Sequence, residues 1–191
     1  DATVSAFVRR YNVDLRQAQQ VADTACHLLA QLEPKMADPE NLDRRFLRWA
    51  GLMHEIGISV AHSSYHKHSA YIVANADMPG FSRMDQGRVS RLVLSHRGKL
   101  ERVASIDPGS VDWLLIACLR LAVVIHRARD VRGIPPITMQ REGRGFSVNT
   151  PAGWLQKLPL TAAALDEEQR QWQALGRGLY VRSLSVRNVA A

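Results

Sequence analysis

Apolar residues recur at a helical spacing through the first two thirds of the chain. From Leu15 to Leu32 they fall three and four residues apart, and Asp14 is placed to cap the start of a helix. The same spacing returns over residues 42–56, where Gly57 is placed to end the helix. The further helices that the pattern predicts cover residues 66–75, 85–95 and 111–128, and the last of these is the most apolar.

The pattern changes after residue 132. Gly133, Pro135 and Pro136 predict a linker, and the alternating runs ITMQ and FSVNT flank the turn-forming EGRG, which predicts a β-hairpin. LTAAALDEEQRQWQALG has the spacing of a helix, and LYVRSLSV is typical of a last strand. We therefore expect a mainly α protein, with a helical domain over residues 1–132 and a small α+β module over residues 133–191.

The charge balance indicates an anionic partner. The 191 residues include 25 Lys and Arg against 18 Asp and Glu, a net charge of +7 at pH 7. The basic residues gather in three runs, over residues 44–48, 88–102 and 126–132.

Three further features restrict the class of protein. No apolar run reaches the roughly 20 residues that cross a bilayer, so we do not expect this chain to be a membrane protein. Cys26 and Cys118 lie within apolar helical patterns, which favours buried free thiols and a cytoplasmic location. The chain opens on Asp1 without the basic and apolar regions of a signal peptide, and we interpret it as a piece of a longer chain.

Four of the seven histidines stand between Met53 and Ile72. His54 and Glu55 are adjacent at the predicted end of a helix, and imidazole and carboxylate are ligands that suit Mn, Fe or Zn. A buried histidine bonded to a backbone carbonyl is the alternative interpretation of the same residues.

Several segments together resemble one protein family. HEIG resembles the His-Asp-x-Gly signature of the HD superfamily of metal-dependent phosphohydrolases. The longer stretch LRWAGLMHEIGISVAHSSYHKHSAYIVANADMPGFS resembles the C-terminal, HD-like region of exopolyphosphatases in the exopolyphosphatase/guanosine pentaphosphate phosphohydrolase (Ppx/GppA) family. The likeness continues through SHRGKL, LLIACLRLAVVIHRAR and PAGWLQKLPL, and YHKHSAYI favours the exopolyphosphatase branch. The resemblance implies that the helical domain is an HD-like bundle.

The resemblance also implies that the metal site of HD enzymes is lost. Those enzymes hold metal through an early His, the His-Asp pair and a late Asp. The matching positions here carry Gln17, Glu55 and Val123, and His54 alone is unchanged. A valine cannot coordinate a cation and an amide replaces imidazole poorly, so we expect no catalytic residue and no metal, with His54 and Glu55 as the remaining candidates.

In the family, N-terminal actin-like domains with glycine-rich phosphate loops carry out hydrolysis with Mg²⁺. This sequence has no GxxxxGK[ST] or comparable loop. The resemblance therefore implies a non-catalytic part of an exopolyphosphatase, without a cofactor of its own. It would hold inorganic polyphosphate and contact the missing N-terminal domains and a second subunit in a homodimer.

Binding polyphosphate requires a track of cations. We expect one bank of cations at the end of the 85–95 helix, a second around residues 66–68, and Arg127, Arg129 and Arg132 as the alternative location. The predicted polyphosphate-binding residues are Arg88, Arg91, His96, Arg97, Lys99, His66, Lys67 and His68.

Two other functions stay open at the level of sequence. One is a surviving HD-type phosphohydrolase with a metal centre built from His54, Glu55, His62, His66 and His68. The other is a purely structural dimerisation module, whose interface would combine the C-terminal hairpin with Trp49, Trp113, Trp154 and Trp172.

Overall fold

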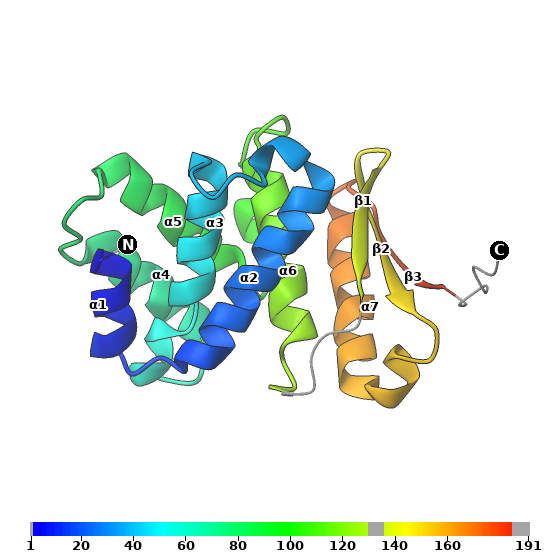
Figure 1. Ribbon diagram of the computed structural model, residues 1–191, viewed down its shortest axis with the longest axis horizontal. Coiled ribbons are helices and arrows are strands. Elements are labelled where there is room, and N and C mark those ends of the chain that lie inside the picture. Colours follow the sequence, from blue (N-terminus) through cyan, green and yellow to red (C-terminus); the bar gives the residue numbers. More distant parts are fainter. Residues whose placement is uncertain (1, 130–135, 185–191) are drawn as a thin grey trace. The chain divides into compact units, whose positions relative to one another are not determined.

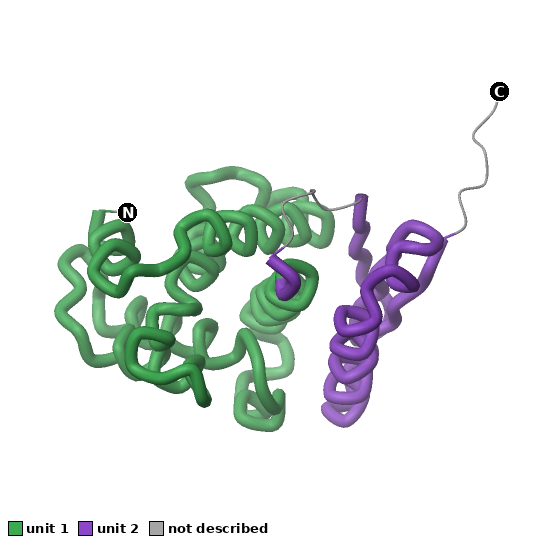
Figure 2. Tube along the Cα trace, turned by 90° about the horizontal axis from the view of Figure 1, so that it is seen from below, with its two compact units in different colours: residues 1–126 green, residues 127–191 purple. Residues whose placement is uncertain are grey.

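The computed structural model describes residues 2–129 and 136–184 of the chain. It divides into two compact units, Asp1–His126 and Arg127–Ala191 (Figure 2). The domain boundary predicted between residues 132 and 133 lies outside the described residues, as does the end of the predicted last strand. The predicted fold class is confirmed, because the chain is mainly α with a small α+β module.

Six α-helices form the first unit (Figure 1). The helix predicted over residues 42–56 ends three residues early, and a short 3₁₀-helix, Ile56–Ser59, follows it. The helix predicted to reach residue 128 ends at Ile125. The helices are α1 (Ala2–Arg10), α2 (Leu15–Leu32), α3 (Leu42–Met53), α4 (Tyr65–Asn75), α5 (Arg83–Ser95) and α6 (Asp112–Ile125).

Helix α1 has no counterpart among the predicted elements. It is only nine residues long, and it buries Val4, Phe7 and Val8 at the i, i+3, i+4 spacing of one helix face. A helix this short is marginal by itself, so packing against α3 stabilises it rather than local preference.

Polar caps explain where three of the other helices begin. The Asp14 side chain accepts a hydrogen bond from the Gln17 N–H, as predicted, and Asn41 caps α3 through the Arg44 N–H. Ser82 and Asp85 form a reciprocal capping box at the start of α5.

The core of the first unit lies where α2 packs against α3 and α6, while α4 packs against α5. Small residues bring α2 and α3 together. Ala18, Ala22 and Ala25 are fully buried, and a Cβ built on Gly51 of α3 would lie 2.8 Å from the Ala22 Cα. Gly51 is therefore required by the close approach of two helix backbones.

The described residues of the second unit form a three-stranded sheet with one α-helix and a short 3₁₀-helix, Leu155–Lys157. Strands β1 (Thr138–Glu142) and β2 (Gly145–Pro151) form the predicted antiparallel hairpin, and β3 (Leu179–Leu184) runs parallel to β2 on its other side. Helix α7 (Pro159–Ala174) makes the crossover between β2 and β3, because parallel strands need such a connection.

Aromatic packing joins this helix to the sheet. Trp172 of α7 meets Phe146 of β2 edge to face, with ring centroids 5.6 Å apart. Gly143 at the hairpin turn has a φ of +57°, which side-chain-bearing residues rarely adopt. This conformation explains the first glycine in EGRG.

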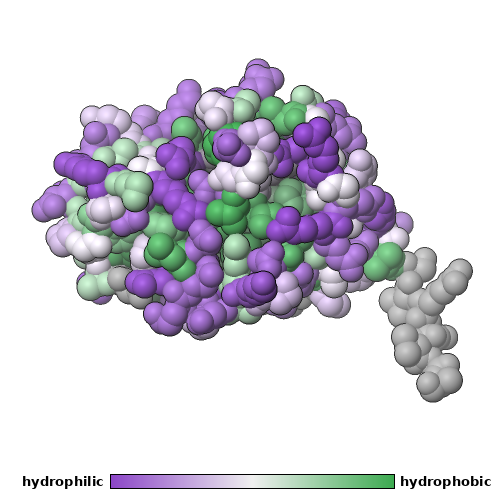
Figure 3. Space-filling view, turned by 90° about the horizontal axis from the view of Figure 1, so that it is seen from above, coloured by the Kyte–Doolittle hydropathy of each residue, from purple (hydrophilic) through white to green (hydrophobic). Residues whose placement is uncertain are grey.

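Both cysteines are buried free thiols, as predicted. Burial raises the pKa of Cys26 and of Cys118 above the ordinary thiol value. In the described part of the chain, none of the helices combines the length and the apolar character needed to cross a membrane. Hydrophilic side chains cover much of the face in Figure 3, with smaller hydrophobic patches between them.

Two helical glycines should respond to alanine in opposite directions. Gly51→Ala places a methyl group against the Ala22 backbone and should destabilise the fold by about 1–3 kcal/mol. Gly87→Ala on α5 meets nothing within 4 Å and should stabilise it by about 0.5–1 kcal/mol, because alanine favours helix. Urea unfolding of both variants measures the difference, and equal effects would contradict the tight α2–α3 contact.

Candidate functional site

A tight corner after α3 carries the histidine-rich segment onto α4. The Ser69 hydroxyl donates to the His54 carbonyl at 2.8 Å and accepts from the Gly57 N–H at 2.9 Å. A Cβ on Gly57 would lie 2.4 Å from the Tyr65 carbonyl oxygen and from the Ser69 nitrogen. Glycine at this position therefore lets α4 pack directly against the end of α3.

This corner brings three buried histidines together, from α4 and from the ends of α3 and α5. The ring centroids of His54 and His96 are 5.0 Å apart, and those of His66 and His96 are 6.2 Å apart. The Tyr65 hydroxyl lies 3.3 Å from His96 Nε2. We call His54, His66, His96 and Tyr65 the histidine cluster.

Backbone carbonyls orient two of these rings. His54 Nδ1 lies 2.7 Å from the Gly51 oxygen, and His96 Nδ1 lies 2.5 Å from the Val93 oxygen. Because a carbonyl only accepts, Nδ1 carries the hydrogen in both rings and Nε2 of the neutral ring is an acceptor. Burial lowers the pKa of His96 well below its ordinary value, and the nearby His54 and His66 lower it further.

His66 is held differently, by an arginine. Arg102 donates to His66 Nε2 over 2.7 Å, so the hydrogen of the neutral ring lies on Nδ1. Within the described residues this buried Nδ1 has no hydrogen-bond partner. Burial, followed by the charges of Arg102 and Arg97, lowers the pKa of His66 to about 4.

The predicted polyphosphate-binding role of His66 and His96 needs correction. Both side chains are buried, and their lowered pKa values keep them neutral near pH 7. Neutral, buried imidazoles cannot supply positive charge to a polyanion near pH 7. Of the three histidines among the predicted polyphosphate-binding residues, only the half-buried His68 retains access to solvent.

Arg88 also belongs to the interior of the fold. It donates to Asp112 Oδ1 at 2.6 and 2.8 Å, pairs with Asp43 Oδ1 at 2.6 Å, and lies over the Phe46 ring. Burial lowers its pKa, but the hydrogen bonds to the two carboxylates outweigh burial and raise it. Arg88 thus joins α3, α5 and α6, and we withdraw it from the predicted polymer track.

The remaining predicted cations are exposed. Arg91 is more than half exposed, although its guanidinium lies 3.6 Å from Asp112 Oδ2. Arg97, which follows α5, lies over the Tyr65 ring at 4.8 Å. Lys67 is exposed, as is Arg102, which was not among the predicted site residues, and both lie close enough to His66 to lower its pKa. We call four exposed cations on α4 and on the segment after α5 the cation rim: Lys67, Arg97, Lys99 and Arg102.

Arg120 also positions part of the cation rim, a role that was not predicted from the sequence. This fully buried residue of α6 donates to the Ser95 carbonyl at 2.8 Å and to the Gly98 carbonyl at 2.9 Å. It therefore fixes the turn from which Arg97 and Lys99 extend. The available signal was a charge inside the most apolar helix, because such a charge must find polar partners.

Comparison with known families now decides the relationship. The family model described as Ppx/GppA phosphatase, domain III, matches residues 1–169. The chain belongs to the Ppx/GppA phosphatase family. The family predicted from the histidine-rich segments is therefore confirmed.

Curated relatives of this Ppx/GppA chain carry the name guanosine-5'-triphosphate,3'-diphosphate pyrophosphatase. Identity is 30% over 180 residues with the protein of Aeromonas hydrophila, and 31% over 183 residues with that of Vibrio vulnificus. These alignments cover 92% and 95% of this chain, but only 36% and 37% of the relatives. The chain thus spans little more than a third of their length, and its assignment to the exopolyphosphatase branch stays a prediction.

Two of the positions expected to replace HD metal ligands, Gln17 and Glu55, have polar neighbours in this domain III. Gln17 donates its side-chain amide to the His126 carbonyl at 3.0 Å, which joins α2 to α6. His54 Nε2 lies 3.9 Å from Glu55 Oε1. Among the described residues, no group of three His, Cys, Asp or Glu side chains is placed to hold a metal. The five-residue centre that included His62 and His68 therefore has no preformed site there.

The tryptophan-based interface is not supported in this Ppx/GppA domain. Trp49, Trp113 and Trp172 are at most 7% exposed and pack within their own units. Trp154 alone of the four is half-buried. Side chains buried in this way cannot form a subunit interface without unfolding, so the predicted homodimer has to rest on other surfaces.

The neutral histidines predict a loss of stability in mild acid. The pKa of His66 is about 4 in the folded chain against an ordinary 6.5, and the pKa values of His96 and His126 are also lowered. Between pH 7 and 4 the unfolded chain takes up protons that the folded chain excludes, so the free energy of unfolding falls. Each such group contributes a slope of up to about 1.4 kcal/mol per pH unit.

Urea unfolding at pH 7.5, 6.0 and 5.0 measures this loss. His66→Gln should reduce the slope, because it removes one excluded proton, whereas His62→Gln, at an exposed position, should leave it unchanged. Identical slopes in all three proteins would show that His66 titrates normally in the folded state.

Proposed function

We propose that this chain is a phosphate-chain-holding, non-catalytic part of a phosphohydrolase, in the first place an exopolyphosphatase. The observation that supports it is the cation rim, four exposed cations on α4 and on the segment after α5, beside the neutral His66 and His96. A linear polyanion binds by displacing counterions from several cations at once and needs no pocket shaped to one chemical group.

The arrangement of the rim favours an extended ligand. Arg97 stacks on Tyr65, and Arg102 is tied to His66, so these two guanidinium groups are held in place. Lys67 near the start of α4 is exposed, and so is Lys99, which lies between the two arginines in sequence. Fixed guanidinium groups can bind phosphate oxygens in a bidentate manner, and the lysines add mobile charge.

Catalysis is assigned to another part of the longer protein. We infer that actin-like N-terminal domains, using Mg²⁺, cleave the terminal phosphoanhydride, while the rim holds the rest of the chain. We also infer a cytoplasmic location, since two buried thiols remain unpaired, and a homodimer in the complete enzyme.

A guanosine polyphosphate is the second candidate ligand, because the curated relatives carry that substrate in their name. It presents the same phosphate groups on a much shorter chain. Charge contacts at the rim would then be fewer, and salt dependence weaker, than with a long polymer.

Removal of three rim cations should weaken polyphosphate binding. Replacement of Lys67, Arg97 and Lys99 by Ala should lower affinity roughly tenfold or more, and should reduce the slope of log K against log salt by about two to three. Arg102 is left in place because it also bonds His66. Titration with polyphosphate and with guanosine pentaphosphate, over a range of salt concentrations, distinguishes the two ligands.

The matched control replaces the exposed Arg16, Lys35 and Arg83 by Ala, which removes the same net charge from other surfaces of the first unit. Circular dichroism checks the fold of both variants. If the control loses as much affinity as the rim variant, binding reflects overall charge and the rim is not the site.

The chain alone should release no phosphate from polyphosphate or nucleotides with Mg²⁺ or Mn²⁺. The physical reason is that Gln17 and Val123 cannot replace metal-binding side chains and that no phosphate loop is present in the sequence. A phosphate-release assay measures this. Turnover that disappears in His54→Ala would overturn the assignment and support an HD-type enzyme.

A further inference from the structure

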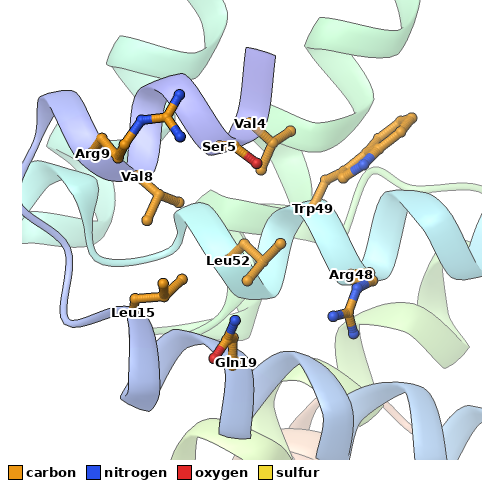
Figure 4. A pocket seen from close by; sticks show the side chains of 9 residues that line it. All are labelled: Val4, Ser5, Val8, Arg9, Leu15, Gln19, Arg48, Trp49 and Leu52. Atoms are coloured by element: carbon orange, nitrogen blue, oxygen red, sulfur yellow. The ribbon is translucent and has the colours of Figure 1, made fainter. Parts of the chain in front are cut away.

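A hollow on the first unit is lined by none of the cation-rim residues. It is formed by α1, α2 and α3 and has a volume of about 430 Å³ (Figure 4). Most pockets for small organic molecules are of this order, at about 300–1,000 Å³. A stable protein interface covers about 800 Å² on each partner, which is far more than these few side chains offer.

Five of the nine side chains that line the hollow are apolar. Val4 and Val8 of α1 and Trp49 of α3 are buried residues that contribute to it. Leu52 is half-buried, and Leu15 at the start of α2 is 49% exposed. Figure 4 shows Val4, Val8, Leu15 and Leu52 grouped together between the three helices. An apolar ligand body placed here would remove this surface from water, which is favourable.

The polar side chains of the hollow are neutral or positive. They are Ser5, Arg9, Gln19 and Arg48, so none of the nine described residues that line it is acidic. Arg48 already pairs with Asp23 at 2.5 Å. By contrast, within the described part of the chain the Arg9 guanidinium has no hydrogen-bond or ion-pair partner.

We propose that this hollow binds a small amphipathic organic anion, a carboxylate attached to an apolar body. The apolar wall would hold the body, and Arg9 would pair with the carboxylate at the edge. A bare polyphosphate has no apolar part to bury here, so the two ligand classes are expected at different places. None of the residues of this hollow belongs to the cation rim.

Octanoate is a suitable probe, with octanol as its uncharged counterpart. A ligand of this size gives a Kd on the order of a millimolar if each heavy atom contributes about 0.3–0.4 kcal/mol. Isothermal titration measures affinity, and methyl NMR shifts at Val4, Val8, Leu15 and Leu52 locate the ligand. We expect octanoate to bind at least about threefold more tightly than octanol, because only octanoate pairs with Arg9.

Two pairs of variants on α1 separate the hollow from general surface charge. Ser5→Glu puts a carboxylate on the lining and should weaken octanoate binding about tenfold or more, while Ala6→Glu adds the same charge at an exposed position outside the lining. Arg9→Gln should remove the preference for octanoate over octanol, whereas Arg10→Gln should leave it intact. All four positions are exposed, so the fold should be retained, and circular dichroism verifies this.

Three results would overturn the proposal. They are no octanoate binding by the unaltered chain at millimolar concentration, equal losses within either pair of variants, and methyl shifts that fall outside the hollow. The affinity of the Ser5→Glu variant for polyphosphate should equal that of the unaltered chain. If polyphosphate does not bind at the cation rim, the proposal for the hollow is unaffected.

Discussion

The organisation of the first unit depends on one close approach between backbones, at the corner between α3 and α4. Gly57 has no room for a side chain because the Tyr65 carbonyl and the Ser69 nitrogen occupy the space. Ser69 then satisfies polar groups on both sides of the corner. This contact sets the position of α4, and with it the place at which His54, His66 and His96 meet. The glycine of HEIG is therefore required sterically, whatever the fate of any metal site.

The histidine cluster has a structural role, because its rings are held in place by neighbouring groups. The rings are fixed by backbone carbonyls and by Arg102. Of the three histidines, His66 and His96 have lowered pKa values and are neutral near pH 7. More positive charge at this point would be costly, because the surrounding cations already repel a proton on His66. The cluster thus supports the segments that carry the cations instead of adding charge to them.

Much of the fold follows from sequence pattern. Five helices, the hairpin, α7 and β3 were predictable because apolar spacing, caps and turn glycines all agree there. Helix α1 was not predicted, because nine residues show too little apolar periodicity to distinguish a helix from an irregular segment. The early end of α3 was not predicted, because Ile56 continues the apolar spacing of the helix in the sequence. In the structure Ile56 begins a 3₁₀-helix.

The site was less predictable than the fold, for reasons that Arg88 and Arg97 make plain. Both residues belong to one basic run that covers α5 and the residues after it. The sequence alone gives no reason to assign them different roles. The separation comes from Asp43 and Asp112, which are distant in sequence and reach Arg88 only in the folded chain. His66 and His96 likewise look like surface cations until the corner at Gly57 buries them. Long-range partners, and not residue type, decide which charges remain available.

The two thiols lead to a practical consequence. Cys26 and Cys118 are buried, unpaired, and held in the protonated form by their surroundings. Since the thiolate is the reactive species, both should resist maleimides and other alkylating reagents while the chain is folded. The two cysteines of this sequence should therefore give little background reaction in site-specific labelling. A single cysteine introduced on an exposed turn would take up a dye or spin label without prior removal of the native pair.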